Sequence, residues 1–210
     1  MSLPAKLPSL ARALGVPLKA SRVSEPVPHD ALTPTESAQF GRLRTAQRRE
    51  DWRRGRAALK SVLGALGESP ETGGLLFPHP RLSLSHSGPV AVAVAVDGAC
   101  PQVAGIGVDF ERARAPRFET ARFFLDDEEH GWLRARSQAD RAQHLLRMWT
   151  IKEAVFKADP ENAEAALFDY HLVDPACDNG VATRGVRRFS YATCHVGDGV
   201  LSIAISLKGK

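Results

Sequence analysis

Hydrophobic and polar residues alternate with a period of two in the middle of the chain and again near its end, which predicts β-strands in both places. In the middle, stretches such as LSLSHS and VAVAVAV predict three strands, at residues 82–87, 90–96 and 103–110. Near the end we expect strands at residues 188–195 and 200–207, joined by a hairpin turn through the sequence Gly-Asp-Gly.

Helical patterns flank these strands. Thr33, Pro34 and Glu36 match an N-cap, a first-turn proline and a capping box, so we expect a helix from Thr33 towards Arg48. A second helix is expected over residues 49–66, where apolar residues recur at helical spacing. After the first group of strands, further helices are predicted at residues 118–125, 126–134 and 140–158.

The order of these elements indicates the fold class. Residues 1–30 are rich in Pro and Ser and predict an irregular arm, with one short strand as an option. Helices, strands, helices and strands then follow, which predicts an α+β fold of two similar lobes, each a helix packed on a small antiparallel sheet. We expect an N-terminal lobe at residues 1–103 and a C-terminal lobe at residues 104–210, related by a pseudo-twofold axis with the functional site between them.

The composition is that of an ordinary globular protein, with 210 residues of which 43% are hydrophobic and 25% charged. No stretch approaches the roughly 20 apolar residues of a membrane span, and no signal-peptide pattern follows Met1. Cys100, Cys177 and Cys194 are far apart and odd in number, so they predict neither a disulfide framework nor a zinc site. We therefore expect a cytoplasmic protein that does not enter a membrane.

The basic residues are concentrated in one segment. Residues 42–60 contain eight arginines and lysines against two acidic residues, in a chain whose net charge is +4. Such a segment favours an anionic partner: a nucleic acid, a phosphorylated small molecule or an acidic protein. The alternative is a solvated helix face without a partner.

Two carboxylates in the sequence GIGVDFE are the first candidates for chemistry. Asp109 and Glu111 lie two apart in a predicted strand and leave the same face, where their charges repel unless a cation lies between them. Hard oxygen ligands of this kind suit Mg²⁺, together with water and substrate phosphates. The alternative is a pair of solvated acids at an exposed strand end.

Two further motifs carry polar groups. In WTIKEAVFK, Glu153 and Lys157 share one helix face, either as a surface ion pair or as a metal ligand beside a phosphate-binding lysine. In SHSG, Ser85 and His86 interrupt the end of a strand with groups able to hydrogen-bond a phosphate, although a lone histidine is more often structural.

The three motifs in this order and spacing resemble the 4′-phosphopantetheinyl transferase superfamily, and most closely its Sfp type, which folds as a two-lobed monomer. The sequence RREDWRRGRAA at residues 48–58 is similar to the arginine-rich helix of the bacterial enzymes, so the resemblance covers roughly residues 42–160. Many relatives use a Gly-Lys-Pro segment around the adenine of their substrate. The corresponding residues 73–80 contain no lysine, and no adenine contact is assigned to them.

The resemblance implies an enzyme, a holo-[acyl-carrier-protein] synthase, that transfers the 4′-phosphopantetheine arm of coenzyme A to a serine of an apo carrier protein and releases adenosine 3′,5′-bisphosphate. It implies Mg²⁺, with Mn²⁺ as an alternative, held by Asp109, Glu111 and Glu153. Glu153, or a metal-bound water, would take the serine proton, and Lys157 would act on the transferred phosphate. Coenzyme A would be bound by Arg48, Arg56, Ser85, His86, Asp109 and Lys157, with Arg48, Arg56 and His86 clamping its nucleotide.

The implied partner is an acidic acyl or peptidyl carrier protein of fatty-acid, polyketide or nonribosomal-peptide biosynthesis, which the basic segment would attract. The apolar residues that follow the acidic strand form either the docking patch for this carrier protein or part of the hydrophobic core. Two other functions stay open: a nucleic-acid-binding module built on the arginine-rich helix, which an aromatic content of 7% disfavours, and a metal-dependent phosphohydrolase. The apolar residues in question are Phe118, Phe123, Phe124 and Trp132.

Overall fold

Two antiparallel β-sheets form the framework of the protein in a computed structural model, which describes residues 2–25, 27–28, 32–98, 100–112 and 116–208. The first sheet has its strands in the order β1-β3-β2, and the second in the order β4-β8-β7-β6-β5. The strands of the first sheet are β1 (Leu18–Val23), β2 (Leu82–Ser87) and β3 (Val90–Val96). Those of the second are β4 (Val103–Arg112), β5 (His171–Leu172), β6 (Asn179–Arg184), β7 (Arg187–Val196) and β8 (Gly199–Leu207).

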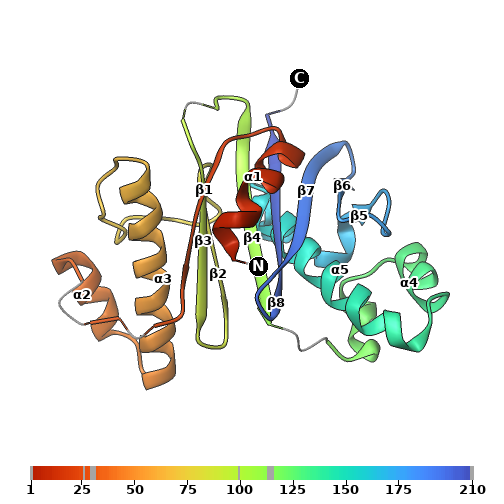
Figure 1. The fold of residues 1–210 in the computed structure, drawn as a ribbon, viewed down its shortest axis with the longest axis horizontal. Helices are drawn as coiled ribbons and strands as arrows, with labels where there is room; N and C mark the ends of the chain where they lie inside the picture. Colours follow the sequence, from red (N-terminus) through yellow and green to blue (C-terminus); the bar gives the residue numbers. More distant parts are fainter. Residues whose placement is uncertain (1, 26, 29–31, 99, 113–115, 209–210) are drawn as a thin grey trace.

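Helices pack on both sheets (Figure 1): α3 lies against the first, α5 against the second, and α1 contacts both β1 and β7. The α-helices are α1 (Leu3–Leu14), α2 (Pro34–Gly41), α3 (Ala46–Ala65), α4 (Asp127–Arg134) and α5 (Gln138–Ala158). Among the described residues, short 3₁₀ helices are η2 (Phe118–Phe123), η3 (Asn162–Glu164) and η4 (Leu167–Asp169). The predicted α+β fold with two antiparallel sheets is confirmed. None of the helices in the described part of the chain has both the length and the apolar character needed to cross a membrane.

The strands predicted from alternation are β2, β3, β4, β7 and β8, each close to its expected bounds. The sequence did not predict β5, which has only two residues, or β6. Most side chains of β6 are half-buried, so its sequence NGVATR lacks the contrast between a buried and an exposed face on which the prediction depends.

The irregular arm expected at residues 1–30 is wrong where the structure has the helix α1, whereas the short strand allowed there is confirmed as β1. Leu3, Leu10 and Leu14 are buried on one face of α1, at the spacing of an amphipathic helix. Pro4 lies in the first turn, where no backbone N–H is required, and the helix ends at Gly15 with a φ of 68°. The proline content hid this periodicity. Residues 1, 26, 29 and 30 of the expected arm lie outside the described residues.

The helix expected from Thr33 towards Arg48 is shorter than predicted and ends at Gly41, as α2. Its capping box is present: the backbone N–H of Thr33 donates to Glu36 Oε2 at 2.9 Å, and that of Glu36 donates to Thr33 Oγ1 at 3.3 Å. Thr45 then accepts a hydrogen bond from the backbone N–H of Arg48 at 3.2 Å and so begins a new helix, α3.

The later helices differ less from expectation. The helix predicted at residues 118–125 is the 3₁₀ helix η2. The helices predicted at residues 126–134 and 140–158 are α4 and α5.

The Val-Ala alternation of β3 separates two cores. Its valines belong to the core that both sheets share with α1, whereas its alanines lie beneath α3 beside Leu59 and Val62. Alanine on that face lets the helix approach the strand closely. The shared core also contains Ile106 and Val108 of β4 and Ile203 of β8, so the two sheets are held together by apolar contact.

The sheets divide the chain between β3 and β4, where the sequence places the boundary between its lobes. Because α1 belongs to the N-terminal segment and yet packs on β7, contacts also cross this boundary. The division into two lobes at residue 103, and the pseudo-twofold axis that would relate them, stay predictions.

Two glycines of β4 allow α5 to approach the second sheet. A Cβ atom added to Gly105 would lie 2.3 Å from the carbonyl oxygen of Ala158, and one added to Gly107 would lie 1.9 Å from that of Ala154. Both obstacles are backbone atoms, which cannot move aside as the end of a side chain can. Any side chain at these positions would therefore push α5 away from β4.

Gly107→Ala is therefore expected to lower the free energy of unfolding by about 1–3 kcal/mol or more, because the added methyl group overpacks the contact with α5. Gly131→Ala is the matched control, since Gly131 lies within α4 with nothing near its missing Cβ, and should instead stabilise by about 0.5–1 kcal/mol. Urea denaturation of both variants measures the difference. Equal effects would contradict the close approach.

Candidate active site

Strands β2 and β4 meet along a ladder of serine hydroxyls instead of a backbone ladder. Ser83, Ser85 and Ser87 alternate along β2, and each Oγ accepts a hydrogen bond from a backbone N–H of β4, at 3.0, 3.2 and 3.2 Å. The donors are the N–H groups of Val108, Phe110 and Arg112. The other edge of β4 pairs with β8, so this serine ladder satisfies the edge that the sheet leaves open.

The serine ladder also holds the two carboxylates of β4. Ser85 donates to Asp109 Oδ1 at 2.9 Å, and Ser87 donates to Glu111 Oε2 at 2.7 Å. Glu111 accepts a second hydrogen bond from the side chain of Trp149 on α5. The predicted pair of Asp109 and Glu111 is thus partly enclosed: Asp109 is 4% exposed, and Glu111 is half-buried.

Helix α5 brings the second motif to the same place. Lys157 Nζ lies 2.7 Å from Asp109 Oδ1 and 3.3 Å from the carbonyl oxygen of Val108, but 3.9 Å from Glu153 Oε2. Lys157 therefore makes its closer contacts with β4, and it is more than the surface partner of Glu153. The glycine-lined contact between β4 and α5 explains how residues 48 positions apart come together.

The charges of the site favour a bound cation. Removal from water raises the pKa values of Glu111 and Glu153, and repulsion between the carboxylates raises them further, while Lys157 opposes the rise. Asp109 Oδ2 is buried and has no hydrogen-bond partner among the described residues. Oxygen donors in this state fit a hard divalent ion such as Mg²⁺.

These carboxylates do not converge to metal-binding distances by themselves. Their ligand oxygens do not all lie within 4.8 Å of one another. In the described part of the chain, only one group of three or more acidic, His or Cys side chains meets that distance, and it lies elsewhere. The assignment of an ion to Asp109, Glu111 and Glu153 therefore stays a prediction.

That other group consists of Asp126, Glu129 and His171, and the ammonium of Lys152 already supplies its positive charge. Lys152 Nζ lies 2.6 Å from Glu129 Oε2, and both side chains are fully buried. Glu129 also accepts from the backbone N–H of Leu172 at 2.7 Å, and His171 lies 2.7 Å from Asp126. Burial lowers the pKa of Lys152 and raises the pKa of Glu129. The group ties α4 and α5 to β5 and needs no metal.

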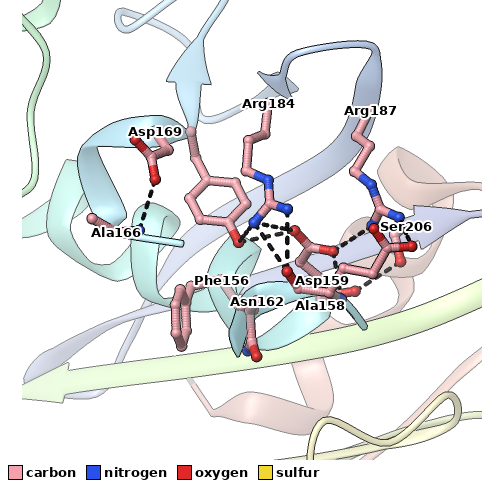
Figure 2. A network of polar contacts seen from close by, with 11 residues as sticks. Phe156, Ala158, Asp159, Asn162, Ala166, Asp169, Arg184, Arg187 and Ser206 are labelled. Carbon is pink, nitrogen blue, oxygen red and sulfur yellow. Dashed lines mark hydrogen bonds and ion pairs between the residues drawn. The ribbon is translucent and has the colours of Figure 1, made fainter. Parts of the chain in front are cut away.

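The end of α5 is fixed two residues after Lys157. Figure 2 shows Arg184 and Arg187 converging on the buried carboxylate of Asp159, at 3.2 and 2.6 Å. The hydroxyl of Tyr170 donates to the same carboxylate at 2.9 Å, and burial raises the pKa of this tyrosine. Because the two arginines flank the turn between β6 and β7, this network anchors α5 to the second sheet.

His86 faces away from the serine ladder, towards α3. A Cβ atom on Gly55 would lie 2.6 Å from His86 Nε2, so the glycine of the arginine-rich helix makes room for the imidazole ring. The imidazole ring forms a hydrogen bond with the backbone of Asp51. Removal from water lowers the pKa of His86, and the charges of Lys157 and Arg56 lower it further, against an opposing effect of Asp51. Both cations therefore lie within electrostatic range of the ring.

The two predicted arginines of α3 have different surroundings. Arg56 donates to the carbonyl oxygen of Thr72 at 2.7 Å, and its guanidinium lies 4.8 Å from the ring centre of Trp52. Burial lowers the pKa of Arg56. Arg48 is exposed, and none of the described residues pairs with its side chain. The structure thus places Arg56 near His86 and leaves Arg48 at the surface.

The predicted apolar patch is largely core. Phe124 is fully buried, and Phe118 and Trp132 pack against the same core of α5 and the second sheet. Phe123 differs, because it is 62% exposed, with the guanidinium of Arg122 4.8 Å from its ring centre.

Several residues that hold the predicted site residues in place were not predicted from the sequence. Ser87 and Trp149 contact Glu111, and Gly55 accommodates His86. A signal for the first was present in LSLSHS, where three serines recur at every second position and so share one face of a strand. Which strand that face contacts was not visible in the sequence.

Glu153→Gln is expected to raise the free energy of unfolding by about 0.5–1 kcal/mol at pH 7.5 in the presence of a chelator, because it removes one of three repelling carboxylates. The pKa of Glu153 is higher in the folded protein than in the unfolded chain, so its ionised form opposes folding. The gain should shrink as the pH falls towards about 4.3, where the unfolded chain also binds the proton. Thermal denaturation measures it, with the exposed Glu119→Gln as an unchanged control. A less stable Glu153→Gln would mean that attraction to Lys157 dominates.

Comparison with known proteins identifies the segment that carries these carboxylates. Residues 105–198, which include most of β4 and all of α5, match the sequence profile of the 4′-phosphopantetheinyl transferase superfamily. Among solved structures, the holo-[acyl-carrier-protein] synthase of Thermotoga maritima is similar at 15% identity and a TM-score of 0.40, over 51% of this chain and 66% of that one, just under two thirds of its length. No protein of curated function matches in sequence. The matched segment, residues 105–198, is thus similar to the superfamily that the motifs predicted.

Proposed function

We propose that the protein transfers the 4′-phosphopantetheine group of coenzyme A to a serine of an apo carrier protein and releases adenosine 3′,5′-bisphosphate. One observation carries the proposal: within the segment that matches the superfamily, Lys157 lies 2.7 Å from the buried Asp109 with Glu111 and Glu153 nearby. A cation beside clustered carboxylates suits a phosphate ester and a divalent ion together.

The acidic group would receive the pyrophosphate end of coenzyme A. Asp109, Glu111 and Glu153 would hold Mg²⁺, or Mn²⁺ in its place, and such an ion neutralises negative charge on phosphate oxygens when it is bound. Lys157 is 29% exposed, so its ammonium can contact a phosphate from solvent without leaving Asp109. Its compact charge would stabilise the phosphate under attack as negative charge develops there.

Glu153 is the residue that we assign as proton acceptor. In the transfer, the serine oxygen forms a bond to phosphorus, the bond from that phosphorus to the nucleotide breaks, and the serine proton must leave. Burial and neighbouring carboxylates raise the pKa of Glu153, which makes it a better base than an ordinary exposed glutamate.

The nucleotide end would lie against α3. His86 interacts electrostatically with both Arg56 and Lys157. Positive charge therefore extends from α5 to α3 and can bind an elongated anion along its length. His86 and Arg56 would bind the 3′-phosphate, with Arg48 contributing from the exposed start of α3. Ser85 would bind coenzyme A only by giving up or sharing its bond to Asp109.

The second substrate would be an acidic carrier protein. The arginines of α3 and the exposed Phe123 beside Arg122 provide the positive charge and the apolar contact that such a protein requires. We further propose that the enzyme is of the Sfp type and acts as a cytoplasmic monomer. The free thiols of Cys100, Cys177 and Cys194 are consistent with that reducing compartment.

Incubation with coenzyme A, Mg²⁺ and an apo carrier protein tests the function directly. Mass spectrometry should show that the carrier gains the mass of one phosphopantetheine group. Asp109→Ala and Glu153→Ala should each lower the rate by about 10²-fold or more while the protein stays folded, and Glu119→Gln should not. Cleavage of coenzyme A without carrier modification would indicate a phosphohydrolase instead. Transfer at the normal rate by both alanine variants would refute the assigned site.

The basic groups are tested with coenzyme A and its 3′-dephospho form. Arg56→Ala and His86→Ala should raise the KM for coenzyme A about tenfold or more and change kcat less, because they bind a phosphate remote from the reaction. The exposed Arg48→Ala should act in the same direction. With 3′-dephospho-coenzyme A, the variants and the wild type should have similar KM values. If the variants discriminate between the two substrates as strongly as the wild type, the assignment is wrong.

A further inference from the structure

Two of the three hydroxyls in the serine ladder perform two tasks each. Ser85 accepts from the backbone N–H of Phe110 at 3.2 Å and donates to Asp109 at 2.9 Å. Ser87 accepts from the backbone N–H of Arg112 at 3.2 Å and donates to Glu111 at 2.7 Å. A hydroxyl has one hydrogen, so each serine commits it to a carboxylate while its oxygen is held by the backbone.

Ser83 performs only the first task. Its oxygen accepts from the backbone N–H of Val108 at 3.0 Å, and among the described residues no carboxylate accepts its hydrogen. It is as buried as Ser85, at 3% against 4% exposure, and belongs to the same strand and the same face. Ser83 is therefore an internal control: it joins β2 to β4 as Ser85 and Ser87 do, but it does not contact the carboxylates.

We propose that Ser85 and Ser87 are positioning residues that set the affinity of the acidic group for a divalent cation. This inference rests on the ion-binding part of the proposed function and assigns to β2 a role beyond contact with coenzyme A. The two serines act through Asp109 and Glu111, which are the groups that would contact the ion.

The bonds of Asp109 explain how positioning works. Its Oδ1 atom accepts from both Ser85 and Lys157, so two donors hold this oxygen in place. Oδ2 is then left buried, with no hydrogen-bond partner in the part of the chain that the structure describes, as the oxygen available to an ion. Without Ser85, the carboxylate could rotate and satisfy Oδ2 through Lys157, and an ion would have to undo that arrangement before binding.

Glu111 is longer and more exposed, so it has more rotamers to lose on binding an ion. Its carboxylate is held by hydrogen bonds from two elements, from Ser87 on β2 and from Trp149 on α5. Preorganisation of this kind reduces the ordering that accompanies binding, and loss of such outer partners typically weakens metal affinity by about 10–100-fold.

Binding of Mn²⁺ to the protein alone, measured by titration calorimetry, tests the proposal without coenzyme A or a carrier protein. Ser85→Ala and Ser87→Ala should each weaken the affinity roughly tenfold or more. Ser83→Ala, the matched control, should lower thermal stability as much as Ser85→Ala and leave the affinity unchanged. Ser87→Thr keeps the hydroxyl and should restore most of the affinity. If Ser85→Ala does not fold, Ser87→Ala at the end of β2 provides the comparison.

Three results would overturn the proposal: equal affinity losses in Ser83→Ala and Ser87→Ala, wild-type affinity in both Ser85→Ala and Ser87→Ala, or no Mn²⁺ binding by the wild type. The proposal would also be overturned if Ser85→Ala raised the KM for coenzyme A but left the Mn²⁺ affinity unchanged. Ser85 would then contact the substrate directly and would not position the metal ligands. Failure of the proposed transfer reaction is separate, because it would appear as an unmodified carrier while the order of Mn²⁺ affinities among the variants persists.

Discussion

The contact between β2 and β4 determines where the acidic group lies. No backbone ladder joins these two strands, and the hydroxyls of Ser83, Ser85 and Ser87 satisfy the N–H groups that β4 turns towards β2. These side-chain acceptors take the place of the backbone carbonyl groups that a neighbouring strand would supply in a regular ladder. The same hydroxyls reach the carboxylates of β4, so contact between the sheets and orientation of the acidic group have one physical origin.

Close packing between β4 and α5 completes the arrangement. Gly105 and Gly107 remove the side chains that would keep α5 away, and the next residues on that face are Asp109 and Glu111. Along this face of β4, two glycines are followed by two acidic residues. Helix α5 places Glu153 and Lys157 beside the first of these acids, Asp109. Burial, and then repulsion between the carboxylates, raise the pKa values of Glu111 and Glu153 in this arrangement.

Strand β2 connects the two halves of the candidate active site through its alternation. Ser85 and Ser87 face β4, whereas His86 between them faces α3, where Gly55 leaves room for its ring. The alternation of side chains along one strand thus places a histidine beside the basic helix and two serines beside the carboxylates. The period-two pattern that predicts a strand is therefore also the pattern that distributes the polar groups.

Local sequence determined the elements whose patterns are strong: the alternation in β3, the capping box of Thr33 and Glu36, and the acidic pair on one face of β4. Its motifs also pointed to the 4′-phosphopantetheinyl transferase superfamily, whose sequence profile residues 105–198 match. It concealed α1, whose leucine stripe is interrupted by prolines, and β6, whose faces differ little in burial. Only the tertiary structure decided that Lys157 contacts Asp109 more closely than Glu153, that Lys152 is buried against Glu129, and that Ser87 holds Glu111. Each of these contacts joins residues from different elements, and periodicity within an element contains no information about the distance between elements.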